Sequence, residues 1–200
     1  MLVRILPSMP RPSFRQLLAF GLLAPWLATG CGSDEASPDD APQDPATLPP
    51  FARDMLDAHN AVRAGVNSPR PSPALEPLGW STHAEEKAKA WAEKCEWGHN
   101  AQRGNLGENI AAATPNFWDT RGVVMAWADE VADYNYENNS CVTGEQCGHY
   151  TQVVWRTTTR VGCATKVCTK NSPFGSQAPT WQYWVCNYDP PGNYQGQRPY

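Results

Sequence analysis

The chain has 200 residues, with 16 basic and 20 acidic side chains and a net charge of −4 at neutral pH. This acidic balance provides no extended positive surface, which argues against nucleic acid as a partner. Seven cysteines in a chain of this length favour disulfides and therefore export to an oxidising compartment.

The first thirty residues have the layout of a secretory signal. They contain three basic residues and no acidic one, followed by an apolar run over residues 17 to 28. The run is too short to span a bilayer, so it is typical of a signal peptide and not of a membrane helix. We predict a signal peptide over residues 1 to 30. Met1 and Met9 are the two alternatives for the first residue of the translated chain.

The signal ends on small residues that precede Cys31, Ala28-Thr29-Gly30-Cys31. This resembles the lipobox at which bacteria attach diacylglycerol to the cysteine before cleavage. We therefore expect Cys31 to be lipidated and to anchor the exported protein to a bacterial membrane. Ordinary signal cleavage after a small residue is the alternative.

Residues 31 to 50 predict a tether. After Cys31 this segment contains five acidic residues, five prolines and almost nothing large and apolar. Such a composition buries too little surface to offset chain entropy, and proline keeps the chain extended. The remaining 150 residues, 51 to 200, are enough for one domain with a proper core.

Six cysteines lie in this domain, an even number in an exported chain, which indicates three disulfides. Fifteen pairings are possible, and the spacing does not choose among them. The cysteines are Cys95, Cys141, Cys147, Cys163, Cys168 and Cys186.

Helical periodicity occurs in three segments, 51 to 66, 81 to 97 and 119 to 135. Thr82 and Glu85 predict a capping box at the start of the second. In the third, Glu130 falls on the same stripe as Trp127 and Tyr134, so we expect its carboxylate to point inward or to line a cleft. Residues 98 to 114 predict turns.

Three later segments predict strands of an antiparallel sheet, because they are rich in β-branched and aromatic residues and are bounded by Gly, Pro and Asn. They are residues 149 to 157, 161 to 169 and 181 to 188. In the first, the pleat would place His149, Thr151 and Val153 on one face. Helices followed by strands indicate an α+β fold.

Several segments, in order, match the CAP superfamily, the group named for cysteine-rich secretory proteins, antigen 5 and pathogenesis-related 1 proteins. They cover nearly all of residues 51 to 200, and the cysteine placement and the closing GQRPY resemble the plant pathogenesis-related branch most closely. The matching segments are AHNAVR at 58 to 63, CEWGHN at 95 to 100, GENI at 107 to 110, AWADEVADYNY at 126 to 136, GHYTQVVW at 148 to 155 and YWVCNYDPPGN at 183 to 193.

The resemblance implies a three-layer α-β-α sandwich around a central antiparallel sheet. It also implies three disulfide pairs, which are Cys95 with Cys168, Cys141 with Cys147, and Cys163 with Cys186.

CAP domains line a cleft with two histidines and two glutamates, which here correspond to His99, Glu108, Glu130 and His149. The imidazoles could hold Zn²⁺ or another divalent ion while the carboxylates orient them. The alternative is a purely structural hydrogen-bond network. In an enzyme, Glu108 and Glu130 would serve a metal-dependent hydrolase of peptides or esters. His59 is expected to be a packed, hydrogen-bonded helix residue.

Some CAP proteins bind sterols or fatty acids at an aromatic loop before the histidine signature. The corresponding residues are Tyr134, Tyr136 and Tyr150, which otherwise would fill the core. Plant members release a peptide that resembles 190 to 200, although for this chain we favour a tail that docks on the domain. We expect a non-enzymatic module that binds lipid, sterol, glycan or protein at its cleft.

Overall fold

A computed structural model describes residues 43 to 200 of this chain. The predicted signal peptide, Cys31 and most of the predicted tether lie outside the described residues. Within the described region, no helix combines the length and the apolar character needed to cross a membrane.

The folded region begins a few residues before the predicted boundary at residue 51. A 3-10 turn, η2 (Pro45–Thr47), is capped by Asp44, and the following Leu48 is only 4% exposed and belongs to the core. Helix α1 (Pro50–Gly65) then begins with proline in its first turn, where no backbone N–H is required.

Helix α2 (Thr82–Ala92) is shorter than predicted. Its cap is Ser81, whose hydroxyl accepts from Ala84 N at 3.1 Å, so the predicted capping box of Thr82 and Glu85 is wrong. The helix ends at Ala92 because the chain turns back soon afterwards, with Cys95 in the left-handed region at φ 52°.

The third predicted helix is divided into two parts. Helix α3 (Thr120–Ala128) is capped by Asp119, whose carboxylate accepts from Gly122 N at 2.6 Å. It tightens into a 3-10 segment, η3 (Asp129–Asp133), before the short hairpin of β3 (Tyr134–Asn135) and β4 (Ser140–Cys141).

The central sheet has four strands in the order β1-β5-β6-β2, which are β1 (Gly79–Trp80), β2 (Gly107–Ala113), β5 (Arg160–Cys168) and β6 (Trp181–Asp189). The predicted antiparallel pairing is confirmed for β5 and β6. Strand β2 also pairs antiparallel with β6, but β1 pairs with β5 in parallel, so the sheet is mixed. Strand β2 lies in the region predicted as turns, because a run of Gly, Asn and Ala has little β propensity.

The segment 149 to 157 does not form a strand, so that prediction is wrong. Residues 148 to 153 form helix α4 (Gly148–Val153). Oε2 of Glu130 accepts two backbone N–H groups at the start of this helix, and Arg63 donates to carbonyls at its end. These tertiary contacts satisfy the groups that a short helix leaves unpaired, and they override the β propensity of the segment.

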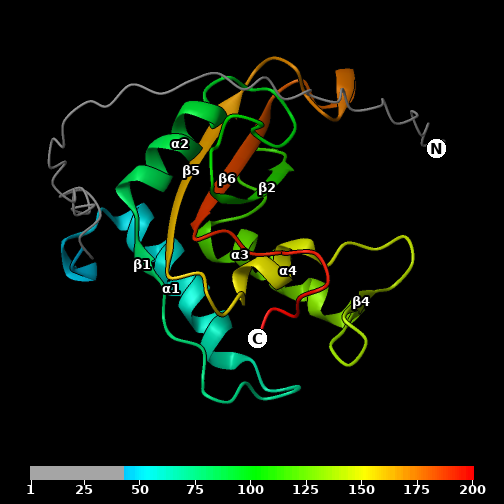
Figure 1. The fold of residues 1–200 in the computed structure, drawn as a ribbon. Coiled ribbons are helices and arrows are strands. Elements are labelled where there is room, and N and C mark those ends of the chain that lie inside the picture. The colour runs from blue at the N-terminus through cyan, green and yellow to red at the C-terminus, as the bar shows by residue number, and fades with distance from the viewer. Residues whose placement is uncertain (1–42) are drawn as a thin grey trace, which may run out of the picture. The chain divides into compact units, whose positions relative to one another are not determined.

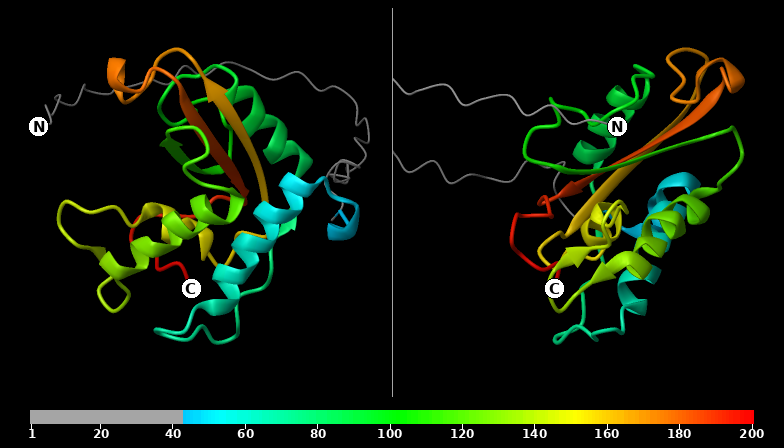
Figure 2. Two further views of the ribbon diagram at one scale, coloured as in Figure 1. Left: turned by 180° about the vertical axis from the view of Figure 1, so that it is seen from behind. Right: turned by 90° about the vertical axis from the view of Figure 1, so that its right-hand side faces the viewer.

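The sheet lies between two helical layers, as Figures 1 and 2 show. Along β6, Trp184, Cys186 and Tyr188 pack into the core shared with α1, α3 and α4. The alternate residues Tyr183 and Val185 pack into a second core against α2. Both faces of the strand are therefore buried, which confirms the α-β-α sandwich.

Gly162 allows α2 to approach β5 closely. A Cβ atom at this position would lie 2.2 Å from Glu85 N and 2.4 Å from Ser81 O. Any larger residue would therefore push the helix off the sheet.

Three disulfides connect the layers and loops. They pair Cys95 with Cys168, Cys141 with Cys147, and Cys163 with Cys186, which are the pairs that the family resemblance implies.

Candidate functional site

The first imidazole–carboxylate pair lies where the loop after α2 meets β2. His99 Nδ1 is 2.8 Å from Glu108 Oε1, which also accepts from Asn100 N at 2.8 Å. The other oxygen, Oε2, accepts from Asn187 Nδ2 at 3.3 Å. The Glu108 side chain is 1% exposed and the His99 side chain 54%, so a buried carboxylate holds an imidazole that faces solvent.

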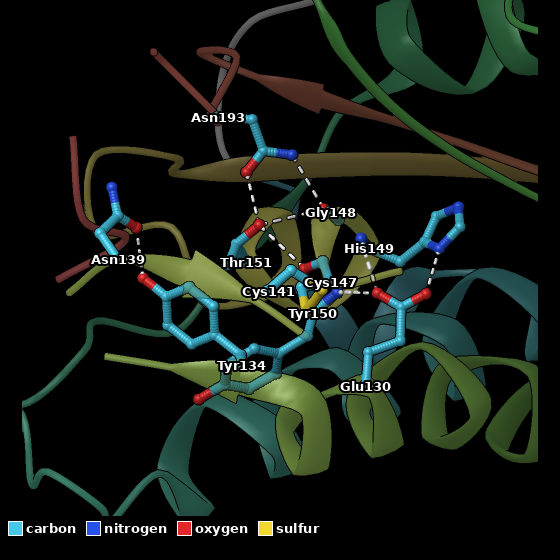
Figure 3. Close-up of a disulfide and its surroundings, with 10 residues drawn as sticks. All are labelled: Glu130, Tyr134, Asn139, Cys141, Cys147, Gly148, His149, Tyr150, Thr151 and Asn193. Carbon is cyan, nitrogen blue, oxygen red and sulfur yellow. Dashed lines mark hydrogen bonds and ion pairs between the residues drawn. A yellow bond between two sulfur atoms is a disulfide. The ribbon is translucent and has the colours of Figure 1, made fainter. Parts of the chain in front are cut away.

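The second pair joins η3 to the start of α4 (Figure 3). His149 Nδ1 is 2.5 Å from Glu130 Oε1, and Oε2 accepts from the backbone N–H groups of His149 and Tyr150 at 2.9 and 3.1 Å. The ring of Trp127 stacks on the imidazole at 6.1 Å. The inward orientation predicted for Glu130 agrees with this geometry.

Both pairs leave Nε2 of the histidine available. Within residues 43 to 200, neither Nε2 atom has a hydrogen-bond partner, while each Nδ1 is held by a carboxylate. This is the arrangement in which proteins present histidine to a metal, because the carboxylate fixes the tautomer and the ring orientation. Each pair by itself thus holds its imidazole as a metal ligand is held, but among residues 43 to 200 no three ligand atoms of His99, Glu108, Glu130 and His149 lie within 4.8 Å of one another.

The pleat of β2 points the side chains of Glu108 and its neighbour Asn109 to opposite faces of the sheet. Glu108 lies on the α2 face of β2, while its neighbour Asn109 lies on the opposite face and donates to His149 O at 3.0 Å.

A different group of three potential ligands lies within 4.8 Å in the described region, His59, Cys163 and Cys186. The two sulfur atoms form a disulfide, and both nitrogens of His59 are hydrogen-bonded. A metal needs thiolates and a free imidazole nitrogen, so this buried cluster does not form a metal site.

A buried network connects the core to the second pair. His59 Nδ1 is 2.7 Å from Met55 O and must donate, because a carbonyl oxygen only accepts. Its Nε2 therefore accepts from the Tyr188 hydroxyl at 2.9 Å, which in turn accepts from Asn109 Nδ2 at 3.0 Å. Burial lowers the pKa of His59 to about 4, so the imidazole is neutral, as this pattern requires.

Arg63 is the second buried polar residue of the AHNAVR segment. Its NH1 donates to Val153 O and Trp155 O at 3.0 and 2.9 Å, and its Nε donates to Glu76 O at 2.8 Å. Burial lowers its pKa to about 10, so it remains charged at neutral pH. A cation at the end of α4 stabilises that helix and therefore the position of His149.

Sequence reasoning did not assign a role to Asn109 or Arg63. Each belongs to a matched family segment, and each is a polar residue next to apolar ones, which was the available signal. Their roles depend on contacts across about 40 and 90 residues of chain, which no local pattern encodes.

The three tyrosines of the predicted ligand loop lie together but are already engaged. The Tyr134 hydroxyl donates to Asn139 Oδ1 at 2.6 Å, Tyr136 stacks on Tyr200, and the Tyr150 hydroxyl is 3.3 Å from that of Tyr200. The predicted docking of the tail on the domain agrees with these contacts.

A separate apolar groove of about 340 Å³ lies between α1 and the segment formed by α3 and η3. Val62, Met125 and Val131 line it, Tyr150 reaches it, and Arg121 and Asp129 also lie along it. Met125 and Val131 are 37% and 44% exposed, which leaves apolar surface accessible for a ligand.

Comparison with known proteins gives relatives both by sequence and by structure. Residues 56–188 match the family model described as CAP, Cysteine-rich secretory protein family. The chain is 44% identical over 154 residues to Pathogenesis-related protein PR-1 of Medicago truncatula, covering 75% of this chain and 79% of that protein. The structure of Schistosoma mansoni venom allergen-like protein 4 superposes with a TM-score of 0.60 at 29% identity, covering 76% of this chain and 95% of that one.

A longer relative matches in one part only. The chain is 43% identical over 146 residues to human Peptidase inhibitor 16, and this match covers 73% of the chain but 31% of that protein. The chain thus spans about a third of the length of such relatives. With the family model matching the region that holds both imidazole–carboxylate pairs, the chain belongs to the CAP family of cysteine-rich secretory proteins.

Proposed function

We propose that this protein is an exported binding protein, anchored to a bacterial membrane through Cys31, that holds a divalent metal ion at His99 and His149. The observation that carries the metal site is that a carboxylate holds each imidazole at Nδ1 and leaves Nε2 available. When bound, zinc would offer open coordination positions to a ligand. Glu108 and Glu130 would orient the two rings.

We further propose that the organic ligand is apolar, of the lipid or sterol class, and enters the groove between α1 and α3. Apolar side chains from both helices line this groove, and Tyr150 extends it toward the second pair. A concave, mostly apolar site with a few polar groups along it is the usual form of a small-molecule site.

The arrangement of the carboxylates favours binding over hydrolysis. A metal-dependent hydrolase would need Glu108 or Glu130 to accept a proton from water. Each carboxylate already accepts three hydrogen bonds, from an imidazole and from two N–H groups. The Thr151 hydroxyl, which is close to His149 in the sequence and could be considered as a nucleophile, donates instead to Asn193 Oδ1 at 2.7 Å.

Zinc titration of the purified full chain tests the metal site. We expect the double variant His99→Ala, His149→Ala to bind zinc at least about a hundredfold more weakly by calorimetry, because both ligands are lost. The matched control is His83→Ala, which removes an exposed histidine of α2. Equal zinc affinity in the double variant and in the wild type would contradict the site.

A fluorescent long-chain fatty acid tests the groove. Ala61→Trp would fill the groove from α1 and should reduce binding at least about tenfold. Ala64→Trp is the matched control, since Ala64 is also exposed on α1 but does not line the groove. Equal binding by both variants would exclude the groove as the fatty acid site.

A further inference from the structure

The tail, residues 190 to 200, returns to the loop that runs from Tyr134 to Tyr150. Arg156 N donates to Pro199 O at 2.7 Å, and Asn139 Nδ2 donates to Gln197 O at 2.9 Å. Pro199 is buried, whereas the residues from 193 to 198 are exposed. The tip of the tail is therefore docked, while the stretch that leads to it lies on the surface.

The docked tip presents an aromatic ring to the tyrosines of the loop. Tyr200 stacks on Tyr136 with centroids 4.8 Å apart and an interplanar angle of 23°. The Tyr136 hydroxyl donates to the backbone oxygen of Tyr200, and the Tyr200 and Tyr150 hydroxyls are 3.3 Å apart. Burial raises the pKa of Tyr134, Tyr150 and Tyr200, so these hydroxyls remain neutral.

Arg198 also binds the loop, through Tyr136 and Glu137. Its Nε donates to Tyr136 O at 2.8 Å, and its NH2 donates to Glu137 O at 2.5 Å. The guanidinium also lies 5.4 Å from the centre of the Tyr136 ring. Two hydrogen bonds to backbone carbonyls and a cation–π contact make a specific site for arginine and not for a general cation.

A cavity of about 330 Å³ lies between the tail and the loop. Asn193, Tyr194 and Gln197 form its tail side, and the Cys141–Cys147 disulfide with its neighbours forms the loop side. Figure 3 shows Asn193 bridging this gap, where it accepts from Thr151 and donates to Gly148. The tail thus forms one wall of a cavity that is open to solvent.

We propose that the loop from Tyr134 to Tyr150 is a recognition site for an Arg-Pro-aromatic peptide segment, and that Arg198, Pro199 and Tyr200 of this chain occupy it. The tail acts as a latch that covers the loop tyrosines and forms one wall of the cavity. A segment of the same chemistry from another protein would have to displace it. This inference uses neither the metal ion nor the groove between α1 and α3, so it can fail or succeed independently of the proposed function.

The test uses a labelled peptide with the sequence of residues 193 to 200 and the full chain with the latch disabled, Arg198→Ala with Tyr200→Ala. The intact tail competes at a high effective concentration, so the double variant should bind the peptide at least about tenfold more tightly than the wild type. Gln195→Ala, in the exposed part of the tail, is the matched control and should behave as the wild type. A peptide with alanine in place of Arg198 and Tyr200 should not bind.

A second measurement covers the case in which the double variant does not fold. In the wild type the Arg198 Nε–H signal should exchange slowly, and Tyr136→Ala should accelerate its exchange at least about tenfold by removing the stacked ring. Faster exchange in Tyr136→Ala supports the latch. Exchange as fast in the wild type as in the free peptide, or a folded double variant that does not bind the peptide, would overturn it.

Discussion

The two imidazole–carboxylate pairs contain the same groups but are protected differently. In the pair of His99 and Glu108 the carboxylate is buried, at 1% exposure, and the imidazole is open to solvent at 54%. In the pair of His149 and Glu130 the exposures are 24% and 15%, and Trp127 covers the ring. The first carboxylate therefore contributes mainly to the fold, whereas the second mainly holds its histidine in place.

The anchoring of the two pairs follows the same contrast. Cys95, four residues before His99, is joined to Cys168 across 73 residues of chain. Cys147, two residues before His149, is joined to Cys141 across only six. One pair is attached to the sheet by a long-range link, while the other belongs to a local loop whose position depends on the buried network of His59, Tyr188 and Asn109.

Removal of the disulfides should give the largest difference between the two sites. From the loop lengths, Cys95→Ala with Cys168→Ala should lower the free energy of unfolding by about 4 kcal/mol, and Cys141→Ala with Cys147→Ala by about 2 kcal/mol. Urea denaturation measures both. Equal losses would mean that the short link stabilises the folded state in ways that loop closure does not describe.

Removal of the carboxylates should separate the pairs next. Glu108→Ala leaves Asn100 N and Asn187 Nδ2 without their buried acceptor and should cost about 3 kcal/mol, whereas Glu130→Ala, in a more exposed position, should cost about 1 to 2 kcal/mol. Chemical denaturation compares the two, with the Gln variants as controls that preserve the shape. A larger loss for Glu130→Ala would reverse our assignment of the structural carboxylate.

Acid should weaken the network behind the second pair. The pKa of His59 is about 4 in the folded protein and about 6.5 when exposed, so between these values the unfolded chain binds a proton that the folded protein does not. Stability should therefore fall as the pH falls, by about 2 kcal/mol between pH 7 and pH 5, with the loss complete below about pH 4. Denaturation of the wild type and of His59→Gln against pH measures this contribution. His83→Gln, at an exposed site, should leave the profile unchanged, and an identical profile for His59→Gln would contradict the prediction.

The smallest effect is expected from Asn109→Ala. It removes hydrogen bonds to His149 O and to the Tyr188 hydroxyl and should cost about 1 kcal/mol. Because the Asn109 side chain donates a hydrogen bond to the second pair and none to the first, histidine NMR signals should shift more for His149 than for His99. Asn187→Ala, which removes a donor to Glu108, should give the opposite pattern. Equal shifts of both histidines in either variant would show that the pairs are coupled more tightly than their separate contacts indicate.

Local patterns predicted α1, β5 and β6 well, because the helix has a clear apolar period and the two strands are rich in β-branched and aromatic residues. The same reasoning failed for β2 and α4. Strand β2 consists of small residues and is a strand because it pairs along β6, from Gly107 with Tyr188 to Ala113 with Gln182. The candidate histidines and glutamates came from the family resemblance, since their separation in sequence is too wide for a local ligand motif.

The sequence by itself determined the class of this protein. Its apolar periodicity and its even number of domain cysteines indicated an α+β domain with three disulfides, because these features can be read from local pattern and composition. The ordered family segments implied the pairing of the cysteines. Only the tertiary structure decided that GHYTQV is a helix, since Glu130 and Arg63 supply the partners for its backbone ends from distant parts of the chain. It also decided that the tail covers the loop tyrosines, because stacking and hydrogen bonds between residues about 60 positions apart form only in the folded chain.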